Sequence, residues 1–135
     1  MAFTITARHS GNTATTPVST LTPSATTPTA DSLYCIGWAS LNDEFTETQA
    51  HSVTGGGLTY TQRLLTAQQQ WAGSNDWVSR ASVWTAPIGA SPGSFAPTAE
   101  SYASAANAYY ALASCDVTGH STTSPIAQSK VGGGD

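Results

Sequence analysis

Residues 33–41 read LYCIGWASL, and this stretch decides the fold class of the chain. Successive side chains of a strand point to opposite faces of the sheet, so the stretch divides into two sets. One set is Leu33, Cys35, Gly37 and Ala39, and the other is Tyr34, Ile36, Trp38 and Ser40. Both sets are largely apolar, which predicts a strand in the centre of a sheet with both faces covered.

Other segments show the same alternation on either side of this stretch. We expect strands at residues 3–7, 60–65, 77–85 and 108–117, an edge strand near 18–21, and short strands near 94–96 and 127–131. Residues 10–12 should end the first strand, and three prolines make residues 13–30 mainly loop. Glycines 55–57 should form a turn that leads into the strand at residues 60–65, because glycine tolerates positive φ.

One segment admits a second interpretation. A short helix over residues 62–71 would place Leu64, Ala67 and Trp71 on one face. With about seven or eight short strands and no convincing long helix, the sequence predicts an all-β chain folded as an antiparallel β-sandwich of jelly-roll or Ig-like type. We expect residues 1–135 to form a single domain, with an irregular N-terminal arm at about residues 1–28 and a short C-terminal tail at about 127–135.

The chain carries very little charge. Four Lys and Arg and eight Asp and Glu make up 9% of its 135 residues, where about a quarter is usual. Four scattered cations cannot neutralise a row of phosphates or an anionic membrane surface, so nucleic acid and membranes are not expected partners. The sequence has no apolar run of the roughly 18 residues that a membrane helix needs and no signal-peptide pattern, so we expect synthesis in the cytoplasm.

Two cysteines, Cys35 and Cys115, lie in the apolar runs of expected central strands. They could be buried thiols that pack as small hydrophobic side chains. Alternatively, they could be joined by one disulfide, worth roughly 4 kcal/mol in the chain-entropy model for so long a loop. Two cysteines this far apart do not make a zinc site.

Catalytic motifs are not convincing in this sequence. Residues 89–93 match the G-x-S-x-G pattern, but no helix follows and Pro92 lacks the backbone N–H that an oxyanion hole requires. Asp116 and His120 could hold a cation, although an aspartate at a strand end more often accepts hydrogen bonds from turn amides. The acidic cluster of Asp43, Glu44 and Glu47 has no EF-hand spacing. We therefore expect no catalytic residue, no cofactor and no metal.

The aromatic residues are the more informative side chains. Four of them fall on expected strands and are predicted to lie in the core: Trp38, Tyr60, Trp84 and Tyr109. Trp71 and Trp77 instead flank a polar loop. Tryptophan is enriched where proteins bind partners, so these two are candidate surface contacts, either for another protein or for a stacked sugar. The alternative is that they pack locally to anchor the loop.

Four stretches together carry a family resemblance: PTADSLYCIGW at residues 28–38, VTGGGLTYT at 53–61, SVWTAP at 82–87 and ALASCDVTGH at 111–120. Their order resembles a β-sandwich module of tailed-bacteriophage virion proteins and related bacterial surface proteins. The match covers about residues 20–128 and consists of a similar succession of strands and turns. Ser32 departs from the Gly-Asp arrangement of the family pattern, and the family supplies no catalytic residues to carry over.

The resemblance implies a structural or adhesive role on the outer surface of a virion. A capsid decoration protein is the expected function, with the major capsid protein or other virion proteins as partners and a homo-oligomer as the expected assembly. Residues 1–28 and 127–135 are the segments expected to contact neighbours. The alternative is a minor tail or fibre adhesin that binds host cell-surface glycan through Trp71 and Trp77.

Overall fold

The computed structural model describes residues 2–13, 18–42, 50–70, 77–101, 108–121 and 126. Within these ranges the fold is all-β, and all strand pairs are antiparallel. The strands are β1 (Thr4–Asn12), β2 (Thr20–Leu21), β3 (Leu33–Asn42), β4 (His51–Thr54), β5 (Thr61–Leu65), β6 (Gln69–Gln70), β7 (Val78–Pro87), β8 (Thr98–Ser101) and β9 (Ala108–Thr118).

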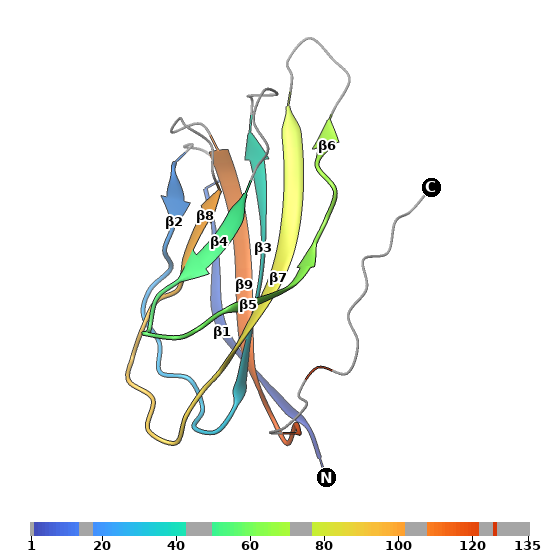
Figure 1. The fold of residues 1–135 in the computed structure, drawn as a ribbon. Helices are drawn as coiled ribbons and strands as arrows, with labels where there is room; N and C mark the ends of the chain where they lie inside the picture. Colours follow the sequence, from blue (N-terminus) through green and yellow to red (C-terminus); the bar gives the residue numbers. More distant parts are fainter. Residues whose placement is uncertain are drawn as a thin grey trace.

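The strands form two sheets. The large sheet has the order β1-β9-β3-β7-β5, with β6 also paired to β7, and the small sheet has the order β2-β8-β4. Figure 1 shows β2, β8 and β4 lying across one face of the large sheet. The predicted β-sandwich is therefore confirmed, and β3 is central as expected.

The register of the three central strands fixes which side chains share a face. On β3 the even-numbered residues face the small sheet, and they pair with even-numbered residues of β7 and β9, as in Ile36 with Trp84 and Ser114. We call this side of the large sheet the inner face. The odd-numbered residues of the same three strands form the opposite side, which we call the outer face.

Apolar side chains of the inner face pack against the small sheet and form the core. The cluster contains Tyr34, Ile36, Trp38, Val53, Ile88, Ala99, Ala108, Tyr110 and Leu112, with Val18, Leu21, Leu58, Tyr60, Trp84 and Phe95 packed against it. Val53 and Ala99 come from the small sheet, so burial of these side chains holds the two layers together.

Two β-bulges interrupt the otherwise regular ladders. In β1 the register shifts between Ala7 and His9, so Arg8 is the extra residue. In β5 it shifts between Gln62 and Leu64, where Arg63 is the extra residue. The bulge in β1 changes the face to which later residues point: Ala7 pairs with Cys115 of the outer face, and His9 pairs with Ser114 of the inner face.

The triple-glycine turn after β4 has positive φ at all three glycines, and at Gly55 and Gly56 a side chain would also meet close neighbours. Gly55 and Gly56 have φ values of 116° and 67°, and a Cβ on Gly56 would lie 2.7 Å from the ring of Phe95. Positive φ and close approach together exclude larger residues here without strain. The predicted glycine turn is thus confirmed, although β4 before it was not predicted.

Several strand predictions need correction. β1 does not end at residue 7 but continues through Asn12, because the bulge restores pairing after the break in alternation. Residues 94–96 contain only an isolated bridge at Phe95, and the strand of this region is β8. The alternative helix over residues 62–71 is wrong, since β5 and β6 occupy it as far as Gln70.

One core assignment is also wrong. Tyr109 lies on the outer face, and its neighbour Tyr110 is the buried tyrosine, 3% exposed. The strand near residues 127–131 and the acidic cluster at 43–47 lie outside the described residues. The expected irregular arm at residues 1–28 contains β1 and β2, so a large part of it belongs to the sandwich.

Candidate functional site

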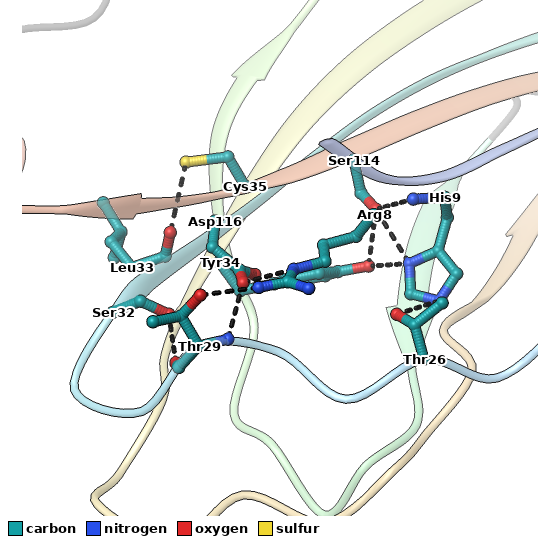
Figure 2. Close-up of polar contacts among 10 residues, drawn as sticks. All are labelled: Arg8, His9, Thr26, Thr29, Ser32, Leu33, Tyr34, Cys35, Ser114 and Asp116. Atoms are coloured by element: carbon teal, nitrogen blue, oxygen red, sulfur yellow. Dashed lines mark hydrogen bonds and ion pairs between the residues drawn. The ribbon is translucent and has the colours of Figure 1, made fainter. Parts of the chain in front are cut away.

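A polar cluster centred on His9 lies on the inner face beneath β1, β3 and β9 (Figure 2). His9 Nδ1 lies 2.8 Å from the hydroxyl of Tyr34 and 2.9 Å from Ser114 Oγ. His9 Nε2 lies 3.1 Å from Thr26 Oγ1. Tyr34 also donates to Ser114 Oγ over 2.8 Å. The cluster therefore ties three strands of the large sheet to the loop that contains Thr26.

An ion pair continues this cluster along β9. Arg8 Nε donates to Asp116 Oδ2, and Arg8 Nη2 donates to Thr29 Oγ1. The same carboxylate oxygen accepts the backbone N–H of Thr29 over 2.6 Å. Asp116 is 1% exposed and the Arg8 side chain 20% exposed, so this pair is largely shielded from water. Arg8 and His9 are consecutive, and the bulge lets both reach inner-face residues of β9.

A second cluster, centred on His51 of β4, bridges the two sheets. His51 Nε2 lies 2.9 Å from Ser40 Oγ of β3, and His51 Nδ1 lies 2.9 Å from Ser82 Oγ of β7. Trp84 Nε1 donates to the same Ser82 oxygen. The imidazole stacks on Trp38 with ring centroids 3.6 Å apart and an angle of 17° between the planes.

Burial shifts the titration of the groups in both clusters. Desolvation lowers the pKa of His9, and it lowers the pKa of His51 to about 3, with a smaller contribution from Arg80. Both imidazoles are therefore neutral at physiological pH. Desolvation also raises the pKa of Tyr34 and raises that of Tyr60 to about 12, so both phenols remain protonated.

The contact between Ser114 and His9 pairs a possible nucleophile with a possible base. Ser114 is 7% exposed and His9 6% exposed, and the serine oxygen is already shared with Tyr34 and with the backbone N–H of His9. Asp116 pairs with Arg8, and the imidazole of His9 is oriented by the hydroxyls of Tyr34, Ser114 and Thr26 and not by a carboxylate within the described residues. This geometry suits cross-linking of segments better than attack on a substrate.

The outer face has a different character. Its rows across β3, β7 and β9 are Leu33-Pro87-Val117, Cys35-Thr85-Cys115, Gly37-Val83-Ala113, Ala39-Ala81-Ala111 and Leu41-Ser79-Tyr109. Each of these positions is uncharged, and the two rows through Gly37 and Ala39 hold no side chain larger than valine. Ala111, Ala113 and Leu41 are exposed. Across these three strands the result is an uncharged and mostly apolar surface that reaches solvent, bordered by Arg63 of β5, whose Nε donates to Thr85 Oγ1.

Small side chains leave the outer face hollowed. Shallow depressions of about 390 Å³ over Gly37 and Ala81, about 410 Å³ over Leu41 and Tyr109, and about 250 Å³ over the cysteines follow one another along the strands. The depression over Gly37 and Ala81 shares Ala39 and Ala111 with the one over Leu41, and it shares Gly37 and Ala113 with the one over the cysteines. The outer face is therefore a continuous shallow hollow, and larger side chains of another molecule would fit into it.

The structure describes one of the two tryptophans that were predicted as surface contacts. Trp77 is half-buried, and its ring lies 5.9 Å from that of Tyr109 at one end of the outer face. Trp71 lies outside the described residues. Trp38 is in the core as predicted, and Trp84 and Tyr60 pack against it partly buried. The structure therefore places one of the two candidate tryptophans beside the outer face.

The other candidate residues have ordinary roles. Asp116 accepts a loop amide, as a strand-end aspartate was expected to do, and His120 Nδ1 lies 3.0 Å from the carbonyl of Val117. Residues 89–93 form a loop beside Phe95. Among the described residues, no group of three or more His, Cys, Asp or Glu could hold a metal ion. A helix with the length and hydropathy to span a membrane is likewise not found in them.

The two cysteines differ from the expectation of buried thiols. Both are free and half-buried, and they lie on the outer face, directly opposite each other on β3 and β9. The sequence pattern already placed Cys35 on the side of β3 away from Tyr34. The pattern did not show the register of β9, which places Cys115 directly opposite Cys35.

Comparison with protein-family models, curated proteins and solved structures finds no match to this chain. The family resemblance of the four sequence stretches therefore stays an expectation, and function has to be argued from the geometry of the two faces.

Proposed function

We propose that this chain is a non-enzymatic structural protein of a bacteriophage virion, a decoration protein that binds the capsid lattice through the outer face. The observation that carries the proposal is the outer face itself: a neutral, low and mostly apolar surface over the three central strands. Exposed apolar patches rimmed by polar residues are typical of protein interaction sites. The resemblance of four sequence stretches to a module of tailed-phage virion proteins is the reason for proposing a virion as the setting.

Contacts made by such a face should resist salt. Salt screens charge–charge attraction, with a Debye length of about 3 Å at 1 M, but it does not weaken burial of apolar surface. The partner would bury alanine, valine and leucine side chains here, and ion pairs would contribute little. Purified particles washed in about 1 M salt should therefore retain the protein, whereas wholesale release would contradict binding through this face.

A matched pair of variants tests the face directly. Ala111→Glu places a charge in the middle of the outer face, where burial against a partner would leave it unpaired. Thr54→Glu adds the same charge on β4, at an exposed position of the small sheet. We expect Ala111→Glu to lose binding to particles stripped of the protein, and Thr54→Glu to bind like the wild type. Equal binding by both variants would overturn the outer face as the docking surface.

Location in the particle tests the virion role. Mass spectrometry of separated heads and tails should find the protein with heads, in many copies. Its absence from both fractions would contradict the proposal, and its presence with tails would favour the second candidate.

That second candidate is an adhesin that binds host glycan. The neighbouring rings of Trp77 and Tyr109 favour it, because they adjoin the depression over Leu41 and aromatic faces stack on sugar rings. A glycan array with the wild type, Trp77→Ala and Trp71→Ala distinguishes the two functions. Binding by the wild type that either substitution removes would favour the adhesin, and no binding in the wild type would leave the decoration protein.

A further inference from the structure

The two cysteines occupy a cross-strand pair. Cys35 of β3 and Cys115 of β9 are direct register partners on antiparallel strands. Such partners have Cα atoms roughly 4.5 or 5.5 Å apart, according to the type of pair, and a disulfide needs a separation of about 4.4–6.8 Å. Both side chains point to the outer face, and both cysteines line the same depression there. The backbone therefore already holds them at bonding range.

The surroundings leave both sulfur atoms within reach of a reagent. Their row continues to Ala7 on β1 and, on the other side, to Thr85 on β7 and Thr61 on β5, and both thiols are half-buried. The two cysteines line the depression of about 250 Å³ with Gly37, Val83 and Ala113, which carry small side chains. Figure 2 shows Cys35 on the side of β3 away from Tyr34 and the His9 cluster. A change at sulfur would thus leave the inner face undisturbed.

We propose that Cys35 and Cys115 form a redox-convertible pair, a dithiol that closes to a cross-strand disulfide by exchange with a small-molecule disulfide. The thiolate of one cysteine attacks the small disulfide, forms a mixed disulfide and releases one small thiolate, which takes up a proton. The thiolate of the second cysteine attacks the protein sulfur of that mixed disulfide and releases the other small thiol. The protein loses two hydrogen atoms and is oxidised, and the small disulfide gains them and is reduced.

The rate of this closure should rise with pH. Burial raises the pKa of both thiols, that of Cys35 to about 11, so only a small fraction is thiolate near neutral pH. Because the thiolate is the nucleophile, exchange should accelerate as the pH rises towards these values. Disulfide formation by this pair should therefore be slow near neutral pH, unlike the reaction of the low-pKa cysteine of a catalytic oxidoreductase.

Titration of the full chain in glutathione buffers of increasing oxidised-to-reduced ratio tests the proposal. Free thiols are then blocked by alkylation, and the protein is digested with trypsin without reduction. Cleavage after Arg63 and Arg80 separates Cys35, in residues 9–63, from Cys115, in residues 81–130. The expected product is these two peptides joined, from a monomer that is lighter than the reduced protein by two hydrogen atoms, and dithiothreitol should restore both thiols.

Single variants supply the matched control. Cys35→Ala and Cys115→Ala fit a face already rich in alanine, and each leaves one thiol that should stop at the mixed disulfide with glutathione. The wild-type digest needs no variant, so the test stands even if a variant folds poorly. Two alkylated thiols, two glutathione adducts or disulfide-linked dimers in the wild type, at a ratio that modifies the single variants, would overturn the proposal.

Discussion

The inner and outer faces of the large sheet belong to the same three strands but use their side chains differently. On the inner face, buried hydroxyls and imidazoles are matched to one another, as in the clusters around His9 and His51. On the outer face, the rows through Gly37 and Ala39 present small apolar side chains to solvent. The inner face therefore carries the buried polar contacts that specify the fold, and the exposed positions of the outer face, such as Ala111 and Ala113, are available for contact.

The ion pair between Arg8 and Asp116 should give the largest effect of an inner-face contact on stability, measured against an exposed carboxylate elsewhere in the sandwich. Asp116→Ala removes a carboxylate that is 1% exposed and leaves Arg8 and the Thr29 amide without their acceptor, which should cost about 3 kcal/mol of unfolding free energy. Urea unfolding measures this. Glu100→Ala, at an exposed position of β8, is the control and should change stability by less than about 0.5 kcal/mol. Equal losses would mean that the inner-face pair does not stabilise the fold.

The pH dependence of stability should come next. The pKa of His51 is about 3 in the folded protein against an ordinary value of 6.5, so the unfolded chain takes up the proton first. Stability from this group is complete above pH 6.5 and is lost as the pH falls towards 3, by up to about 1.4 kcal/mol per pH unit, or about 2 kcal/mol by about pH 5. His9 acts in the same direction.

Substitution of the imidazole isolates its share of this effect. His51→Gln keeps a group that can both donate and accept, but it does not titrate. The variant should be less stable near neutral pH and should lose less stability than the wild type between about pH 6.5 and 5. Urea midpoints collected across this range give both slopes, and identical slopes would show that His51 is not buried in its neutral form.

Removal of a single tyrosine hydroxyl from each face compares how much the two faces contribute to stability. Tyr34→Phe removes an inner-face hydroxyl that bonds His9 and Ser114 and should cost about 1–2 kcal/mol, because both partners stay buried. Tyr109→Phe removes an outer-face hydroxyl and should cost less than about 0.5 kcal/mol. Thermal or urea unfolding of the two variants measures the contrast, and a larger loss for Tyr109→Phe would reverse it.

The smallest effect is expected at Gly37 on the outer face. A Cβ at this position would meet nothing closer than 4.0 Å, so Gly37→Ala should stabilise the strand by about 0.5 kcal/mol. Gly119→Ala is the contrast, because Gly119 has a φ of 75° and its Cβ would lie 2.3 Å from the carbonyl oxygen of Ala2. Destabilisation by Gly37→Ala would mean that the outer face is packed more tightly than its depressions indicate.

The sequence predicted the central strands well because their pattern is local. Alternation identified β3, β7 and β9, with two largely apolar sets in the case of β3, and the resulting fold class was right. β4 and β8 were missed because His51–Thr54 and Thr98–Ser101 are short and mostly polar, and their strand conformation follows from pairing with each other. β1 appeared to end early because its bulge at Arg8 breaks the alternation.

The candidate sites were less predictable, since they join residues distant in the sequence. His9 and Ser114 are 105 positions apart, and nothing local marks either as a partner of the other. The outer face was partly visible in the alternation of residues 108–117, but its uncharged rows appear only when the register of the strands is known. The same holds for the pairing of Cys35 with Cys115.

The two bulges have a consequence for how copies of this protein can associate. β1 and β5 are the ends of the strand order in the large sheet, and each carries a bulge with an arginine as the extra residue. An unprotected outermost strand can recruit a strand from a second molecule and extend the sheet sideways, and local kinks and charged side chains oppose this. The bulges at Arg8 and Arg63 thus lie at the two lateral borders of the sheet, where the local kink opposes addition of a further strand, while both side chains bond inwards, Arg8 to Asp116 and Arg63 to Thr85. Copies of the protein would therefore associate more favourably through the outer face than along the edges of the sheet.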